Sequence, residues 1–253
     1  MIKSVTFTED YELSLEKESQ RRWGVKTYQP TRWTREKKPW DMFTLFKKGL
    51  EIKFNPGVNV IVGENGSGKS TLFSLIKDYS GKGWEKIYSV IGTYEDKDEE
   101  YYHQHYQKEY KGPLKVDGVI TYRTAVYFDA EKDNPVVAIP KMVNPMNKDF
   151  VSLTTQLWFA MEESHGESML PVLAYILQNA KDCVIFMDEP ETALSLKNQF
   201  WLVKQMIESN IQRNNQIIIS THALGIIQHF DTIFDMETRK WVNREIYIGD
   251  MMK

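Results

Sequence analysis

The stretch GENGSGKST, residues Gly63–Thr71, decides the fold of this chain. It matches the pattern G-x-x-x-x-G-K-[ST] and follows the apolar run VNVIV at Val58–Val62, which is typical of a buried strand. A helix is expected from Ser70. The three glycines of the stretch let the backbone turn tightly, so that its N–H groups and the helix N-terminus face phosphate oxygens. The stretch therefore predicts a phosphate-binding loop between a strand and a helix.

The side chains of this loop predict a bound nucleotide with magnesium. Lys69 would reach the β- and γ-phosphates of ATP. The Ser70 hydroxyl would bind Mg²⁺, which needs only one or two protein oxygens when phosphates supply others. The candidate nucleotide-binding residues are Gly63, Glu64, Asn65, Gly66, Ser67, Gly68, Lys69, Ser70 and Thr71. ATP and Mg²⁺ are thus the expected cofactors.

A second motif places two acids at the end of an apolar run. Val184–Met187 is followed directly by Asp188 and Glu189. If this run is a strand parallel to the first, Asp188 would belong to the magnesium shell and Glu189 would face the water that attacks the γ-phosphate. The alternative is a plain helix start, because Asp, Glu and the following Pro190 are also common at a helix N-terminus.

A third motif ends in a histidine. The strand-like run QIIIS at Gln216–Ser220 leads directly into Thr221 and His222. A histidine at the carboxyl end of a strand beside a phosphate site can donate to the γ-phosphate, whereas a lone histidine is more often a packed surface residue. The neighbouring motifs favour the first interpretation, which gives Lys69, Glu189 and His222 as candidate catalytic residues.

The three motifs together resemble those of the ATP-binding cassette ATPases, in the order in which that family carries them. Between them, SHGES at Ser164–Ser168 resembles the family's signature loop. The resemblance implies a head-to-tail homodimer formed with ATP, in which Ser164, Gly166 and Glu167 of one copy meet the nucleotide of the other. A helix N-terminus after the loop would favour that anion. Without the other motifs, SHGES would be a plain helix cap.

Departures from the transporter pattern resemble one branch of the family. The residues that replace the usual ones are Glu163, His165, Glu167, Glu191 and Ser195. They are similar to the SMC-like and RecF-like branch, and most of all to small prokaryotic ATPases with SHGE and DEPE motifs. That likeness implies a switch in DNA maintenance or repair, or in anti-phage defence, acting on a partner effector. The alternatives are a transporter cassette subunit and an ATP-gated binding module that hydrolyses slowly.

Two further departures concern coupling to the γ-phosphate. The family places a glutamine after a strand, where this chain has Asp129, Ala130 and Glu131. Asp129 is the candidate metal ligand at this point, with Glu131 and then Gln156 as alternatives. Pro171, seven residues beyond the signature serine, should kink a helix that begins there.

Composition limits the other classes of function. The chain has 253 residues, 42% hydrophobic and 26% charged, with no apolar run near the roughly 18 residues that span a bilayer. We therefore expect a cytoplasmic protein without a membrane contact. A single cysteine, Cys183, excludes an internal disulfide and is expected in the core, and His103 and His105 lack a third metal ligand.

A local basic segment keeps a nucleic-acid contact open although the net charge is −3. Lys17–Lys48 has ten basic residues against three acids, with aromatic residues between them. One interpretation is that this segment binds a nucleic-acid backbone or stacks on its bases. The alternative is a solvated surface whose tryptophans pack on the adjoining strands. Trp33, Trp40 and Phe43 are the candidates for stacking on adenine.

The predicted architecture is a single α/β domain over residues 1–253 of the P-loop NTPase class. An antiparallel β lobe at the N-terminus includes the basic, aromatic residues 1–49, an insertion occupies 81–118, and a helical signature region occupies 149–179. A mostly parallel sheet forms the centre. The expected elements after the insertion are strands at Val119–Phe128, Cys183–Asp188 and Gln216–Ser220, and helices at Phe150–Glu162, Ser168–Asn179 and Leu196–Asn210.

Overall fold

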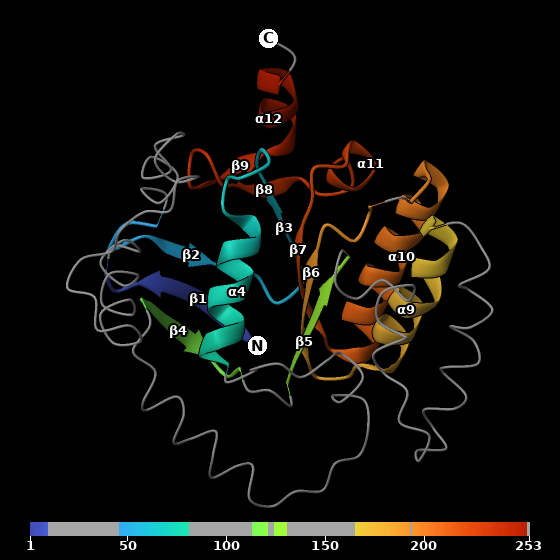
Figure 1. Ribbon diagram of the computed structural model, residues 1–253, viewed down its shortest axis with the longest axis horizontal. Coiled ribbons are helices and arrows are strands. Elements are labelled where there is room, and N and C mark those ends of the chain that lie inside the picture. Colours follow the sequence, from blue (N-terminus) through green and yellow to red (C-terminus); the bar gives the residue numbers. More distant parts are fainter. Residues whose placement is uncertain (10–45, 81–112, 121–123, 131–164, 193, 252–253) are drawn as a thin grey trace, which may run out of the picture.

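The computed structural model describes residues 1–9, 46–80, 113–120, 124–130, 165–192 and 194–251, and they form two sheets with helices packed around the larger one (Figure 1). The larger sheet has the order β5-β6-β7-β3-β8-β9. Its strands are β3 (Val58–Val62), β5 (Ala125–Asp129), β6 (Val184–Asp188), β7 (Gln216–Ser220), β8 (Thr232–Asp235) and β9 (Lys240–Asn243). The helices are α4 (Lys69–Tyr79), α9 (His165–Asn179), α10 (Leu196–Arg213), α11 (Leu224–Ile227) and α12 (Arg244–Met251).

The larger sheet is parallel except at one edge. Strand β3 pairs in parallel with both β7 and β8, β6 pairs in parallel with β5 and β7, and the edge strand β9 is antiparallel. The register sets Asp129 opposite Asp188, and Asp188 opposite Ser220. This confirms the predicted α/β architecture. It also brings the ends of β5, β6 and β7 to one edge of the sheet, where parallel strands place their sites.

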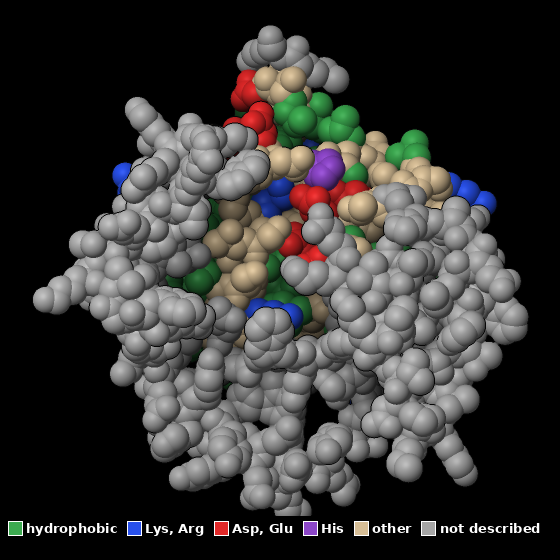
Figure 2. Space-filling model, in the orientation of Figure 1, with side chains coloured by type: hydrophobic (Ala, Val, Ile, Leu, Met, Phe, Trp, Pro, Cys, Tyr) green, Lys and Arg blue, Asp and Glu red, His purple; other side chains and the backbone are tan. Residues whose placement is uncertain are grey.

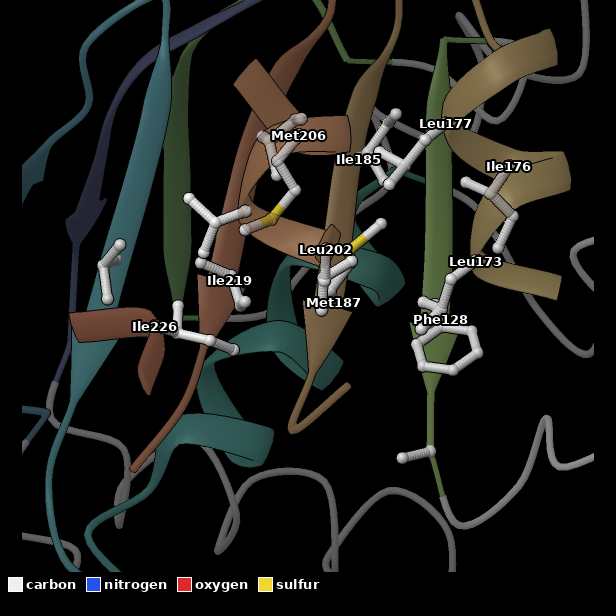
Figure 3. Packing of buried hydrophobic residues seen from close by; sticks show 14 of the residues in the cluster. Phe128, Leu173, Ile176, Leu177, Ile185, Met187, Leu202, Met206, Ile219 and Ile226 are labelled. Carbon is white, nitrogen blue, oxygen red and sulfur yellow. The ribbon is translucent and has the colours of Figure 1, made fainter. Parts of the chain in front are cut away.

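Consecutive apolar residues of the central strands cover both faces of this sheet. Ile217 and Ile219 belong to one buried cluster and Ile218 to the other. Helices α9 and α10 cover the first face, where Leu173, Ile176 and Leu202 pack toward the strands (Figure 3). Helix α4 covers the second face with Leu72, Phe73 and Ile76. Burial on both faces explains why these strands are apolar throughout instead of alternating.

The smaller sheet is antiparallel, with the order β2-β1-β4. Its strands are β1 (Ile2–Phe7), β2 (Glu51–Lys53) and β4 (Leu114–Gly118). The buried Gln216 side chain joins it to the larger sheet by accepting from Ile2 N at 2.7 Å and donating to Ile2 O at 2.8 Å. Phe46, from the basic and aromatic N-terminal segment, is buried here and stacks on Phe7. The predicted antiparallel lobe is present; we expected it to extend through Val62, but β3 belongs to the parallel sheet.

The predicted strand at Val119–Phe128 is wrong in its first half. Strand β4 ends at Gly118 and β5 begins at Ala125. Gly118 has φ +119° and lies so close to Met1 O that an added Cβ would stand 2.3 Å away, so the chain turns there. Val119 is 65% exposed although it is apolar. Residues 114–118, which we placed in the insertion, are instead a strand of the small sheet.

The helical region is described only in part. Helix α9 runs continuously from His165 through Pro171 to Asn179, three residues longer at its start than predicted. Proline cannot donate the amide hydrogen that the carbonyl of residue 167 would otherwise accept. The predicted helix at 150–162, residues 81–112 and most of the basic segment lie outside the described residues. No described helix is long and apolar enough to span a membrane.

Candidate nucleotide site

The GENGSGKST loop connects β3 to α4 and has the backbone that its glycines permit. Gly66 and Gly68 have φ of +85° and +98°, and an added Cβ at Gly63 would stand 2.7 Å from Ser67 Oγ. The Lys69 side chain folds back over the loop: its Nζ donates to Gly63 O at 2.9 Å and to Glu64 O at 3.2 Å. The ammonium is therefore held at the mouth of the loop, where phosphates would lie.

The turn between β8 and β9 supports the loop from the side. Met236 N donates to Val62 O at 2.9 Å, and the Met236 side chain fills the space beside Gly63 and Gly68. The Glu237 carboxylate accepts from Glu64 N at 3.3 Å. An added Cβ at Gly68 would also meet the Phe46 ring at 3.1 Å. The loop is thus packed by two segments distant in sequence.

Three of the predicted catalytic side chains meet at the carboxyl edge of the sheet. Glu189 Oε1 lies 3.5 Å from Lys69 Nζ and 3.5 Å from His222 Nδ1. Glu189 has φ +47°, and its N–H donates to Ser220 O at 3.0 Å, which fixes the carboxylate at the end of β6. Figure 2 shows acidic, basic and histidine side chains lying next to one another on this face. The described residues between Asp188 and Leu196 form turns and no helix, so the Asp-Glu-Pro segment does not itself start a helix.

Asp188 lies beside this group at the last position of β6. Its Oδ1 accepts a hydrogen bond from Ser220 Oγ, and the same hydroxyl oxygen accepts from Glu189 N at 3.2 Å. Asp129 occupies the paired position on the neighbouring strand β5. The register thus pairs Asp129 with Asp188 at the ends of β5 and β6, and the substitution of Asp129 for the missing glutamine stays a prediction.

Glu191 is a residue whose part in the site sequence reasoning missed. We noted it only as a departure from the transporter motif, yet it is 6% exposed and its Oε1 accepts from Thr221 Oγ1 at 2.7 Å and from His222 N at 3.1 Å. Burial raises the pKa of the Glu191 carboxyl, and the hydrogen bonds from Thr221 and His222 oppose the rise. A pattern of apolar and polar residues carries no sign that a glutamate is buried.

The described residues fit a nucleotide with magnesium. Ser67 Oγ is buried in the loop without a hydrogen-bond partner among the described residues, and the Lys69 ammonium already rests on backbone carbonyls that a phosphate could replace. Ser70, the second residue of α4, is exposed, and hard oxygen donors follow at Asp188 and Asp129. Hydroxyl and carboxylate oxygens are the ligands that Mg²⁺ prefers.

Other predicted site residues are placed less fully. Gly166 and Glu167 lie in the first turn of α9. Ser164, Glu131 and Gln156 lie outside the described residues, as do Trp33, Trp40, Phe43, His103 and His105. Cys183 is buried as expected, and the described residues contain no group of three or more potential metal-binding side chains of the His, Cys, Asp and Glu kind.

Parts of this chain are similar to known proteins. A family model described as "AAA domain" matches residues 42–83. The lacticin-481/lactococcin-DR transport/processing ATP-binding protein of Lactococcus lactis is 25% identical over 77% of this chain and 26% of its own length. A Methanosarcina acetivorans protein described as an ABC transporter ATP-binding protein is 26% identical over 72% of this chain and 69% of its own length. The chain is thus similar to ATP-binding proteins of transport systems, and its own fold, with a phosphate loop between β3 and α4, is that of a P-loop NTPase.

The chain also aligns with solved structures. A nucleotide-free ATP-binding cassette from an ABC transporter is 16% identical, covers 81% of this chain and 88% of its own length, and has a TM-score of 0.48. An inward-facing metal-chelate type ABC transporter has a TM-score of 0.46 at 16% identity, over 78% of this chain and 76% of its own. This chain spans about a quarter of the length of the lactococcal relative.

Proposed function

We propose that this cassette binds ATP with magnesium and hydrolyses it. The observation that carries the proposal is the meeting of Lys69, Glu189 and His222 at one point, with two 3.5 Å contacts to a single carboxylate oxygen. Glu189 would accept the proton of the attacking water, Lys69 would neutralise phosphate charge, and His222 would contact the γ-phosphate. Magnesium, held by Ser70, Asp188 and Asp129, would supply further charge neutralisation.

The turnover of the Glu189→Gln variant tests this assignment. Glutamine keeps the size of the side chain but is not a proton acceptor, so phosphate release should fall roughly 10²- to 10⁴-fold while ATP binding persists. Glu208→Gln, which neutralises a partly exposed acid on α10, is the matched control and should hydrolyse ATP like the parent. A Glu189→Gln protein that turns over at the parent rate would remove Glu189 from the mechanism.

We further propose that two copies close head to tail over ATP. The resemblance places Ser164, Gly166 and Glu167 of one copy at the nucleotide of the other, and Gly166 and Glu167 occupy the first turn of α9, where the helix N-terminus favours an anion. With ATP and magnesium, Glu189→Gln should become a dimer, because hydrolysis no longer empties the interface. Adding Ser164→Arg should prevent this. Light scattering on a sizing column distinguishes monomer from dimer. A double variant that still dimerises like Glu189→Gln would contradict the assignment of SHGES as the signature loop.

The partner we propose first is a membrane transporter, because the named relatives are transport or transporter ATP-binding proteins. They favour this role over the SMC-like role that the SHGE and DEPE motifs suggested. The cassette would then work at the cytoplasmic side of the membrane. Co-purification of the tagged cassette with a permease from solubilised membranes would support this role.

A second candidate is a soluble SMC-like ATPase that acts in DNA maintenance or defence and controls an effector. Buried Glu191 favours it, since transporter cassettes usually have threonine at that point of the motif. Any direct DNA contact would come from Lys17–Lys48, and duplex affinity should then fall steeply with salt. Salt-sensitive duplex binding by the ATP-bound Glu189→Gln protein, with no permease in the membrane experiment, would reverse the order of the two candidates.

A further inference from the structure

Glu191 is a buried acid at the catalytic edge with no part in the proposed hydrolysis. It follows β6 by three residues and lies within the turns that lead to α10, where Thr192 N donates to Glu189 O and Leu194 N donates to Glu191 O. A buried carboxyl group costs free energy unless its oxygens are hydrogen-bonded. Oε1 of Glu191 is hydrogen-bonded, whereas Oε2 is buried without a hydrogen-bond partner among the described residues. Stability alone therefore does not account for a glutamate here.

The bonded oxygen of Glu191 holds the segment that follows β7. Oε1 accepts from Thr221 Oγ1 and from His222 N, and Thr221 Oγ1 in turn accepts from Ala223 N at 3.0 Å. One carboxylate oxygen thus orients the backbone on both sides of the His222 Cα. These bonds tie the segment after β7 to the segment that carries Glu189.

The His222 side chain itself has little packing to hold it. It is 53% exposed, and its Nδ1 lies 3.5 Å from Glu189 Oε1 and 3.9 Å from Glu191 Oε1. The direction of an exposed ring depends on the backbone that carries it, and that backbone is what Glu191 fixes. A threonine in place of Glu191 is too short to bring an oxygen to the same two donors.

We propose that Glu191 is a positioning residue, which holds His222 and Glu189 at their mutual distance so that both meet the γ-phosphate and its attacking water. The inference rests on the proposed ATP hydrolysis but is tested first without nucleotide. It assigns the role to the acceptor oxygen, so a glutamine at 191 should serve nearly as well as the glutamate.

Amide hydrogen exchange in the nucleotide-free protein measures the contact directly. In Glu191→Thr the His222 amide loses its acceptor, and its exchange should accelerate about fivefold to tenfold, the equivalent of one net hydrogen bond. In Glu191→Gln it should stay within about twofold of the parent. Unchanged exchange in Glu191→Thr, or equal acceleration in both variants, would overturn the assignment whatever the ATPase activity.

A double-mutant cycle then tests the route through His222. Glu191→Thr should lower kcat about tenfold and leave the ATP dissociation constant unchanged. When His222 is already alanine, the same substitution should lower kcat by less than about twofold. If Glu191 were only structural, Glu191→Thr would lower the melting temperature and would lower kcat by the same factor in the parent and in His222→Ala. That result would overturn the proposal. Glu191→Gln should retain most of the activity.

Thr221→Val keeps the test decisive if Glu191→Thr does not fold. Valine preserves the shape of the threonine but removes the hydroxyl between Glu191 and Ala223 N. The Ala223 amide should then exchange faster, and kcat should fall by a smaller factor than in His222→Ala. A Thr221→Val protein with parental kcat and parental exchange would reject the proposal as well.

Discussion

The two ends of the parallel sheet handle buried polar groups in opposite ways. At the amino ends of β3 and β7, Asn59, Asn215 and Gln216 are at most 1% exposed, and each amide both donates and accepts hydrogen bonds. At the carboxyl ends, the Ser67 hydroxyl and one oxygen of Glu191 are buried without partners among the described residues. The buried amides at the amino ends are hydrogen-bonded within the chain, whereas the carboxyl ends hold buried polar atoms that could bond to a ligand.

This difference separates stability from function along the same strands. Satisfied amides stabilise the junction of the two sheets, whereas the Lys69 ammonium and the His222 imidazole each lie 3.5 Å from the Glu189 carboxylate, a clustering of charged groups that is typical of a functional site. Substitutions at the amino end should therefore change the free energy of unfolding, and those at the carboxyl end should change nucleotide chemistry.

The largest contrast is expected from Lys69→Ala at the carboxyl end. The variant loses a 4% exposed ammonium that would meet the β- and γ-phosphates, so ATP affinity should fall roughly tenfold to 150-fold, the equivalent of a charge-assisted hydrogen bond. Equilibrium binding of labelled ATP measures this. Lys204→Ala, which removes an exposed lysine of α10, is the matched control. Equal ATP affinity in Lys69→Ala and the parent would contradict the claim that side chains at the carboxyl end bind the nucleotide.

Gln216→Leu tests the amino end. Leucine fills a similar volume but leaves Ile2 N, Ile2 O and Asn55 O without the side-chain partner, at a cost of about 1–3 kcal/mol for each group left unsatisfied. Urea unfolding should show the loss, while ATP affinity of the folded protein stays at the parental value. Gln178→Leu on the exposed side of α9 is the control. A stable Gln216→Leu protein would mean that the two sheets are held together elsewhere.

The smallest expected effect concerns the pH dependence of stability at Glu191. Burial raises the pKa of this carboxyl in the folded state above its ordinary value of 4.5, so the folded protein binds its proton more tightly than the unfolded chain. The contribution of Glu191 to stability must then fall as pH rises above 4.5. Glutamine at 191 cannot ionise. The melting temperature of Glu191→Gln, relative to that of the parent, should therefore rise as the pH is raised from 4.5 to neutrality. A difference independent of pH would contradict the raised pKa.

Local patterns predicted the features that local sequence controls. The phosphate loop, its two neighbouring elements and the strand bearing Asp188 follow from glycine spacing and short apolar runs, and β7 has the predicted bounds of Gln216–Ser220. These parts of the fold and site are contained within about ten residues each.

Features that depend on tertiary contacts were not predictable in the same way. The break at Gly118 arises because Met1 approaches its backbone, and the burial of Glu191 arises because Thr221 and His222 lie above it. The β8–β9 hairpin joins short segments with no strong alternation of their own. For Gly118 and Glu191 the decisive neighbour lies at least 30 residues away along the chain, so no short window of sequence contains both partners.

The position of β3 has a consequence for how the chain acquires its site during synthesis. This strand carries the phosphate loop, yet both of its sheet neighbours, β7 and β8, come from residues 216–235, and the turn that packs the loop supplies Met236 and Glu237. A nascent chain that has emerged from the ribosome only through α4 has the loop sequence but none of these supports. Because such long-range pairing also slows folding, the capacity to bind nucleotide should be among the last properties that the growing polypeptide gains.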